Sequence, residues 1–212
     1  MLSSIKGVIG EATTKFDNQP NRNTNIKIAA GKVNEFVVNP GETFSFSKEL
    51  GEVSKNTGYK PAGTFLNHKI VDSIGGGICQ VTSTLYQALV KSDLKIVERN
   101  QHSMRVPYCT IGLDAMYYEG QSDLKFQNTF DFPIVIKSYV SNGELTFKIF
   151  GDTDKKIIIL NYLHLMYLKY QCPSKKFKIL VYLKAKELLL KRDSLVIEAL
   201  LISKKKMRNQ YY

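Results

Sequence analysis

The sequence predicts an α+β fold, in which helices pack on a mostly antiparallel sheet. Residues 24–36 place apolar side chains at three- and four-residue spacings, which is typical of an amphipathic helix. A second helix is expected at about residues 79–90, where Val81, Leu85 and Leu89 share one face. Residues 131–151 form two alternating runs joined by Asn142-Gly143, the strongest two-residue signal for a β-hairpin.

The remaining elements follow from turn signals and short alternating runs. Asn23 or Thr24 is the expected N-cap of the first helix. A Pro-Gly turn at residues 40–41 precedes a half-buried strand that includes Phe44 and Phe46. A short hairpin is expected at residues 65–74, and short strands are expected at 94–100, 102–108 and 114–119.

Charge separates the chain into a main domain and a tail. The chain has 212 residues, 43% of them hydrophobic, which is enough to bury one good-sized core. The net charge of +11 lies wholly in residues 155–212, which carry 14 Lys and Arg against 3 Asp and Glu. The main domain therefore carries no net charge, and we expect it to have no nucleic-acid partner.

The tail, residues 155–212, has an unusual composition. It contains none of the 14 glycines of the chain and is rich in Lys, Leu, Ile and Tyr. It could form one or two basic helices around residues 178–206 that bind a membrane surface or a partner, or it could be disordered. The same bias also results when an A/T-rich gene is translated out of register. We favour this explanation of the tail over a segment that binds a membrane surface or a partner.

The cysteines and the N-terminus bear on location. Cys79, Cys109 and Cys172 have no CxxC spacing and their count is odd, so no disulfide scaffold is predicted. Residues 1–16 lack the apolar run of about 7 to 15 residues that a signal peptide needs, and no stretch reaches the roughly 18 apolar residues of a membrane span. As written, the chain is expected to be cytoplasmic.

The stretch GGGICQVTSTLYQAL, residues 75–89, suggests a nucleophilic site. A cysteine in the first turn of a helix lies where unpaired N–H groups and the helix dipole stabilise a thiolate and lower the thiol pKa. The glycines before it permit positive φ and leave room for a substrate. The same N–H groups could stabilise an oxyanion when the sulfur attacks a carbonyl.

A nucleophilic cysteine needs a base and a group that orients the base. His102 begins a predicted strand and Asp114 opens the next, so the expected roles are nucleophile for Cys79, base for His102 and orienting acid for Asp114. This chain order is the one that papain-like and transglutaminase-like thiol enzymes use, and a similar arrangement is one option for the fold. His68 and His164 are weaker candidates, because one lies in a loop and the other in the tail.

Structural roles for the same residues stay open. A cysteine on an apolar helix is commonly a small buried hydrophobe, and a glycine triplet can simply form a tight turn. The stretch lacks the GxxxxGK[ST] pattern of phosphate loops, and the His and Cys residues have no metal-ligand spacing. We therefore predict no metal and no cofactor.

Long motifs carry a family resemblance. The segments NPGETFSFSKELGEVSKNTGYK, GGGICQVTSTLYQAL and VERNQHSMRVPY, with residues 112–118 and 132–140, closely resemble the VanW-like family, which is named after an accessory protein of type-B vancomycin resistance clusters. The resemblance covers about residues 10–152. It implies an extracytoplasmic or membrane-anchored envelope protein of Gram-positive bacteria, with peptidoglycan or cell-wall peptide as partner. The sequence shows no anchor, so we expect a fragment or a frameshifted member, whose membrane contact would need the missing anchor or the basic tail.

The family pattern maps onto named residues. The motif positions are Gly75, Gly76, Gly77, Cys79, Gln80, Ser83, Thr84, Leu85 and Tyr86, followed by the His102-Ser103 pair and the acidic position Asp114. Leu113 stands where similar sequences usually have arginine, and Ile111 stands where proline is common. These departures put in doubt any role that needs the charge of that arginine, but they leave Cys79, His102 and Asp114 intact.

Two functions from different classes follow. The first is thiol-dependent acyl transfer or amide cleavage on cell-wall peptide, with Gly76, Gly77, Gln80, Ser83 and Ser103 as substrate-binding residues. The second is a non-catalytic module that binds peptidoglycan or a glycopeptide, with Gln80, Thr82, Ser83, Tyr86, Tyr117 and Tyr118 shaping a groove.

Overall fold

The structure is a computed structural model that describes residues 5–66 and 69–156. The chain divides into two units after Asp154. The predicted tail helices lie outside the described residues, as do His68, His164 and Cys172. None of the helices in the described part of the chain is long and apolar enough to cross a lipid bilayer.

The predicted α+β class is confirmed by helices combined with antiparallel strands. The elements run in the order β1 (Gly7–Lys15), α1 (Pro20–Lys32), β2 (Phe36–Val38), β3 (Thr43–Ser45), α2 (Phe46–Leu50), β4 (Pro61–Leu66), β5 (Lys69–Ile74), α3 (Ile78–Lys91), β6 (Lys95–Glu98), β7 (Lys125–Gln127), β8 (Ile134–Ser141), β9 (Glu144–Gly151) and α4 (Thr153–Lys156).

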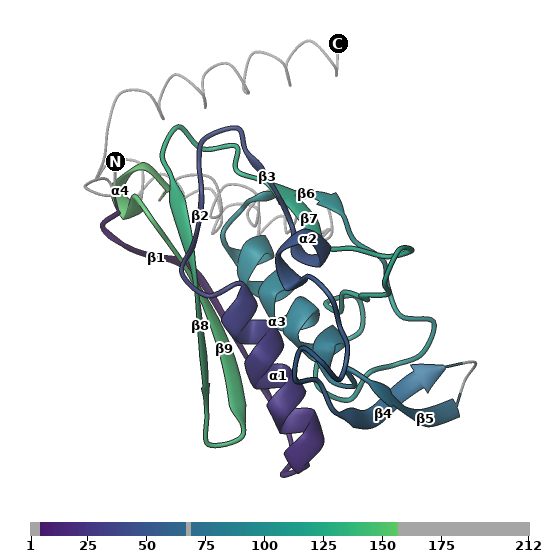
Figure 1. The fold of residues 1–212 in the computed structure, drawn as a ribbon. Helices are drawn as coiled ribbons and strands as arrows, with labels where there is room; N and C mark the ends of the chain where they lie inside the picture. Colours follow the sequence, from purple (N-terminus) through teal and green to yellow (C-terminus); the bar gives the residue numbers. More distant parts are fainter. Residues whose placement is uncertain (1–4, 67–68, 157–212) are drawn as a thin grey trace, which may run out of the picture. The chain divides into compact units, whose positions relative to one another are not determined.

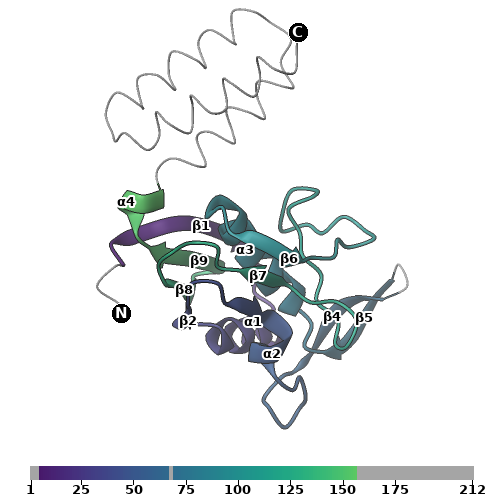
Figure 2. The same ribbon diagram turned by 90° about the horizontal axis from the view of Figure 1, so that it is seen from above.

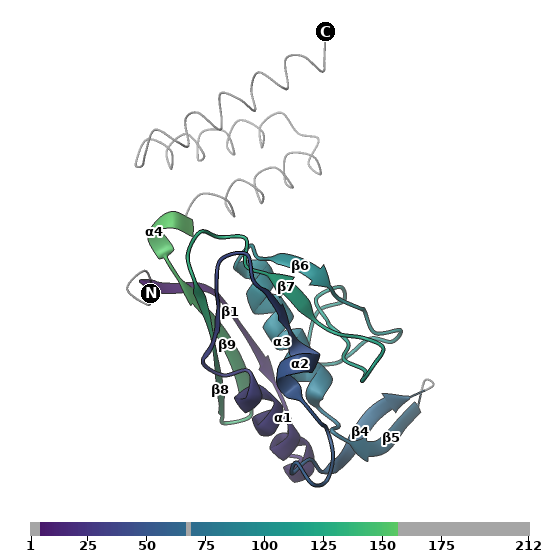
Figure 3. The same ribbon diagram turned by 45° about the horizontal axis from the view of Figure 1, so that its top comes forward.

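The strands form three antiparallel groups around the two long helices. A four-stranded sheet has the order β1-β9-β8-β2, a three-stranded sheet has the order β3-β7-β6, and β4 pairs with β5. Helix α3 packs on β1 and β9, and α1 packs on β8 and on α3. Figures 1 and 3 show these helices between the large sheet and the smaller strands, and Figure 2 shows the β4–β5 hairpin on the side away from the large sheet.

The hydrophobic core lies between the large sheet and these helices. Leu145, Phe147 and Ile149 occupy every second position of β9 and are fully buried. This alternation follows from the period of two in a strand, which directs successive side chains to opposite faces. Full burial of each such side chain contributes about 1.5–3 kcal/mol, so this face fixes the register of β9 against its neighbours.

The Asn142-Gly143 hairpin forms as predicted. Asn142 has φ 50° and Gly143 has φ 75°, so both central residues adopt the left-handed conformation that a two-residue turn with matching strand twist requires. The hairpin joins β8 to β9. The predicted hairpin before the glycines also forms, although its first strand begins earlier, at Pro61.

Three predicted boundaries were wrong. The helix expected to reach residue 36 ends at Lys32, and Phe36 begins β2. Helix α1 begins at Pro20, whose fixed φ suits the first helical position, and the Thr24 hydroxyl donates back to the Pro20 carbonyl instead of capping the helix. Phe46 begins α2 rather than continuing the strand, because the Ser45 hydroxyl accepts the N–H of Lys48 and caps a helical turn.

The strands expected at residues 102–108 and 114–119 do not form. Only isolated bridges occur there, between Asn100 and Met116 and between Tyr118 and Ser122. The main-chain groups of this region are bound by side chains instead, since Asp114 accepts the His102 N–H and Arg99 donates to the Asp114 carbonyl. His102, expected at the start of a strand, therefore lies in an irregular loop.

Strand β1 was not predicted, and it approaches α3 very closely. A Cβ atom on Gly10 would lie 2.1 Å from the Ser92 hydroxyl and 2.6 Å from the Ala88 carbonyl oxygen at the end of α3. The pairing of β1 with β9 also shifts register between Val8 and Gly10. The contact therefore requires a residue without a side chain.

We expect Gly10→Ala to destabilise the fold by about 1–3 kcal/mol, because the added methyl group overlaps backbone atoms of α3 that cannot move independently. Gly31→Ala is the matched control, since a Cβ atom there meets nothing within 4 Å. In the helix α1 this change should stabilise the protein by roughly 0.5–1 kcal/mol. Chemical denaturation measures both, and equal effects would contradict the role assigned to Gly10.

Candidate active site

The glycine triplet lets α3 begin against two other elements. Gly75 has φ 86° and Gly77 has φ 110°, so both need the conformation that the sequence predicts for them. A Cβ atom on Gly76 would lie 2.4 Å from the carbonyl oxygen of Ala62 in β4, and one on Gly77 would lie 3.0 Å from Arg22 Cγ of α1. The space beside these glycines is thus largely filled by the protein itself.

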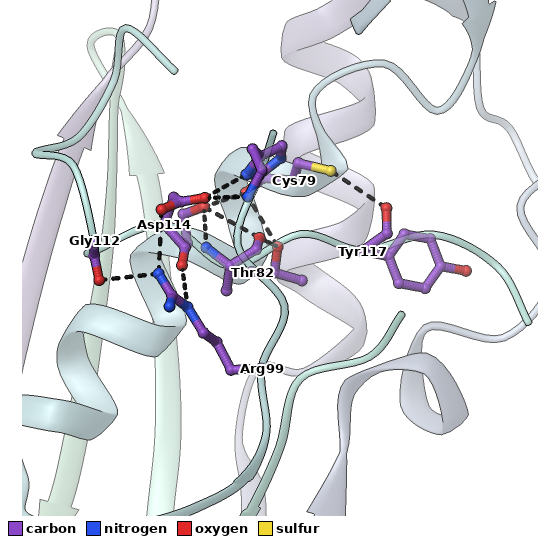
Figure 4. Close-up of polar contacts among 9 residues, drawn as sticks. Cys79, Thr82, Arg99, Gly112, Asp114 and Tyr117 are labelled. Carbon is purple, nitrogen blue, oxygen red and sulfur yellow. Dashed lines mark hydrogen bonds and ion pairs between the residues drawn. The ribbon is translucent and has the colours of Figure 1, made fainter. Parts of the chain in front are cut away.

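Cys79 lies in the first turn of α3 and is partly buried. Its sulfur donates a hydrogen bond to the Tyr117 carbonyl at 3.4 Å, as Figure 4 shows. The N–H groups of Ile78 and Gln80 donate to the carbonyls of Gly75 and Gly77. No acceptor in the described part of the chain receives the N–H of Cys79, which remains available at the helix start.

The expected fall of the Cys79 pKa is not observed. Burial is the largest influence and raises the pKa of the thiol above its usual value, while the charge of Arg22 acts in the opposite direction without reversing the shift. The reason is that removing a thiolate from water costs more than the hydrogen bond with Tyr117 and the charge of Arg22 return. A thiol of this kind needs a base to become a nucleophile.

His102 and Asp114 form a buried pair. Asp114 Oδ2 lies 2.7 Å from His102 Nδ1 and also accepts the His102 backbone N–H at 2.7 Å. The two side chains are 9% and 5% exposed, so water competes little for these bonds. A carboxylate at Nδ1 selects the neutral tautomer with its proton there, which leaves Nε2 as a proton acceptor.

Arg99 completes the surroundings of Asp114. Its guanidinium donates to the Asp114 carboxylate at 3.2 Å, to the Asp114 carbonyl at 2.6 Å and to the Gly112 carbonyl at 2.9 Å (Figure 4). Burial acts to raise the pKa of Asp114, but the bonds from His102 together outweigh it, and the pKa lies below its ordinary value. The carboxylate is therefore charged at neutral pH.

Arg99 was not predicted from the sequence, although the residue stands three positions before His102. At position 113, where the family resemblance implies an arginine, this chain has Leu113, which is 39% exposed and carries no charge. Arg99 also lies over the Tyr86 ring, 5.0 Å from its centre, which holds the guanidinium in place. Arg99 thus supplies a positive charge beside Asp114 in this chain.

Hydroxyl groups of α3 hold the loop that carries Asp114. Thr82 Oγ1 donates to the Ala115 carbonyl at 2.6 Å, and Ser83 Oγ accepts the Ala115 N–H at 2.9 Å. Gln80 donates its amide to Thr14 Oγ1 at 3.0 Å and to the Lys15 carbonyl at 2.8 Å. These polar residues, which the sequence suggested for substrate binding, make internal bonds.

A cleft of about 770 Å³ opens at the start of α3. Among the expected site residues, its lining includes Cys79, His102, Gly76, Gly77 and Gln80. Ser83 is fully buried and Ser103 is exposed, and neither lines the cleft. Asp114 lies behind His102.

The sulfur and the imidazole share the cleft without a hydrogen bond between them. The only hydrogen bond of the Cys79 sulfur within the described residues is the one to Tyr117. Tyr117 and Tyr108, which the sequence analysis did not connect to catalysis, also line the cleft. Catalytic hydrogen bonds are commonly long before a substrate is bound, so this geometry leaves proton transfer open.

The remaining titratable groups give no metal site. In residues 5–66 and 69–156, no three His, Cys, Asp or Glu side chains gather where they could hold a metal ion.

Cys109 is partly buried, and burial raises its pKa to about 11. Cys109 therefore serves as an internal reference for thiol reactivity.

Fold and site together define an α+β domain with a helix-start cysteine and a carboxylate-bound histidine on one cleft. Residues 21–150 match the family described as VanW like protein, and the chain belongs to that family. It is 36% identical over 145 residues to an uncharacterised protein, YoaR, of Bacillus subtilis, covering 68% of this chain and 48% of the relative. It is 33% identical over 146 residues to the vancomycin B-type resistance protein VanW of Enterococcus faecalis, covering 66% of this chain and 53% of that protein.

The chain spans about half the length of the curated relatives it matches. No solved structure matches it. The expected family membership is confirmed by these comparisons.

We expect Asp114→Asn to destabilise the protein by about 2 kcal/mol at pH 7, because the amide loses the charge that Arg99 and His102 bind. The lowered pKa of Asp114 means that the carboxylate stabilises the fold above about pH 4, where it is ionised in the unfolded chain, and that this stabilisation is lost as the pH falls through the lower folded value. The difference between the two proteins should therefore shrink below about pH 4.

Denaturant unfolding at several pH values measures this difference. Asp72→Asn is the control, because Asp72 is exposed on β5 and its replacement should leave stability almost unchanged. A difference for Asp114→Asn that is constant from neutral to acidic pH would contradict the assigned ionisation.

Proposed function

We propose that this domain is a thiol-dependent enzyme that transfers an acyl group or cleaves an amide bond in cell-wall peptide. The observation that carries the proposal is the cleft that Cys79 and His102 share, with Asp114 bound to Nδ1 of the imidazole. This is the order of nucleophile, base and orienting acid that acyl transfer uses.

The proposed reaction begins when His102 Nε2 takes the proton of the Cys79 thiol. The raised pKa of that thiol makes this base necessary, since little thiolate would form without it. The sulfur then attacks the substrate carbonyl carbon, and the carbonyl oxygen becomes an oxyanion. The proton on His102 passes to the leaving amine, which leaves an acyl-enzyme that water or a second amine resolves.

The oxyanion needs a hydrogen-bond donor near the sulfur. The N–H of Cys79 has no acceptor among the described residues and lies at the start of α3, where the helix dipole favours negative charge. This donor belongs to the nucleophile itself, so its position relative to the sulfur is fixed by the chain.

The proposed substrate class rests on sequence similarity to relatives. One relative is named a vancomycin B-type resistance protein, and the family resemblance points to peptidoglycan or cell-wall peptide outside the membrane as partner. The presence of both polar and aromatic groups in the cleft, including Arg22 and Tyr117, suits a peptide with alternating amide and apolar parts.

We expect iodoacetamide to label Cys79 faster than Cys109, and the Cys79 rate should fall about tenfold when His102 is changed to Ala. Burial raises the pKa of both thiols, so the faster rate at Cys79 depends on His102, which accepts the proton and so supplies the thiolate, whereas Cys109 lies off the cleft. Peptide mass mapping over time gives each rate separately.

Ser103→Ala is the matched control for this experiment, since the exposed Ser103 neighbours His102 but does not line the cleft. Equal labelling of Cys79 and Cys109, or a Cys79 rate that ignores His102→Ala, would remove the case for a thiol enzyme. Incubation of the full chain with peptidoglycan fragments, followed by mass spectrometry, tests for product directly.

One observation favours the alternative of a non-catalytic binding module. The Cys79 thiol donates its hydrogen bond to the Tyr117 carbonyl rather than to His102, and burial raises the pKa of this thiol. If the domain only binds wall fragments, Cys79→Ser should keep their affinity unchanged in isothermal titration, and the wild-type chain should yield no product. Loss of product in Cys79→Ser with affinity retained would support the enzyme instead.

A further inference from the structure

Arg22 is a cation of α1 that lines the cleft and makes no ion pair with a carboxylate of the described residues. Its Nη1 donates to the Gln80 side-chain oxygen at 2.8 Å, and Arg22 lines the same cleft as Cys79. Gln80 is only 1% exposed, and its amide nitrogen is already committed to Thr14 and Lys15. The Gln80 oxygen therefore points at Arg22 and fixes one edge of the guanidinium.

The rest of the guanidinium has spare donors. No carboxylate of the described residues lies within ion-pair distance of Arg22, although the charge of Asp17 acts on it from farther away, and the guanidinium carbon lies 6.0 Å from the centre of the Tyr108 ring. Arg99 differs, since its donors are taken by Asp114 and the Gly112 carbonyl. A partly buried cation without a directly paired carboxylate carries a desolvation cost, which a carboxylate of a ligand would offset.

We propose that Arg22 receives a carboxylate of the molecule that occupies the cleft, beside the group that faces Cys79. A guanidinium binds a carboxylate through two parallel hydrogen bonds, which sets orientation as well as charge. The inference rests on the proposed function in one respect: it makes the substrate a peptide with a free carboxylate close to the carbonyl that is attacked.

The overall charge of the cleft does not explain such selectivity. Lys15 and Arg22 line it together with Asp17 and Glu119, so the four charges balance. Lys15 is also highly exposed, with its amino group 3.6 Å from Glu144. Recognition of a carboxylate would therefore depend on Arg22 itself, which shares the cleft with Cys79 and whose charge acts on the thiol.

Paired alkylating reagents test this directly. Iodoacetate and iodoacetamide both form a bond from the thiolate sulfur to the reagent carbon, iodide leaves, and the thiol proton passes to a base or to water. They differ only in that iodoacetate carries a carboxylate. The ratio of their rates at Cys79 therefore reports carboxylate binding, and changes in the thiol pKa cancel because both reagents need the same thiolate.

We expect the iodoacetate to iodoacetamide ratio at Cys79 to fall roughly tenfold in Arg22→Gln, as loss of a charge-assisted hydrogen-bond pair implies. Arg22→Lys should give an intermediate ratio, since the charge remains and the paired donors are lost. Lys15→Gln is the control and should leave the ratio almost unchanged. A ratio that is unaffected by Arg22→Gln, or that falls as much in Lys15→Gln, would overturn the proposal.

Protection of the wild-type chain gives a second test that needs no variant. N-acetylalanine should slow iodoacetamide labelling of Cys79, whereas N-acetylalaninamide should not, because the two differ only in the carboxylate. The α-amide of N-acetylaspartate separates a chain-terminal carboxylate from one on a side chain. Equal protection by N-acetylalanine and its amide, or none by either at tens of millimolar, would contradict the site.

The outcomes separate this site from the proposed reaction. If no peptide product is ever formed but the ratio falls in Arg22→Gln, the carboxylate site stands and the enzymatic function fails. If peptides are cleaved and the ratio does not depend on Arg22, the enzyme stands and the carboxylate site fails.

Discussion

The hydrogen bonds between α3 and the main chain of Ala115 determine the geometry of the site. Ser83 accepts the Ala115 N–H, and Thr82 donates to the Ala115 carbonyl, both from fully buried positions. Asp114 immediately precedes Ala115 and Tyr117 follows it by two residues. The same two hydroxyls thus help to position the Asp114 carboxylate, which binds His102, and the Tyr117 carbonyl, which accepts the hydrogen bond from the Cys79 sulfur. Because loss of either would leave polar groups unpaired in the core, the loop has little freedom to move.

Local chemistry explains which parts of the structure the sequence predicts. The Asn142-Gly143 hairpin and the helix that carries Cys79 depend on nearby residues, namely left-handed turn positions and an apolar face, so a single stretch of sequence contains the signal. The loop of His102 has no such signal, because its conformation depends on a carboxylate twelve residues away. Strand β1 was not predicted because the contacts that define it are made far along the chain. It pairs with β9, and Gly10 lies against α3.

The candidate site divides in the same way. The residue types Cys79, His102 and Asp114 were predicted from their order, and the bond between the last two supports their pairing. Arg99 and Arg22 could not be predicted, because an arginine acquires a role only through what its long side chain reaches in the folded protein. The rise of the Cys79 pKa was also beyond the sequence, since burial opposed the helix terminus and only packing determines burial.

The pairing of β1 with β9 has a consequence for the limits of the domain. The family match begins at residue 21, after β1 has ended at Lys15, yet β1 pairs along most of β9. A shorter version that began with α1 would expose β9 as an open sheet edge and invite pairing with other molecules. It would also release Gln80 from Thr14 and Lys15, so the smallest stable unit is defined by backbone pairing rather than by sequence similarity.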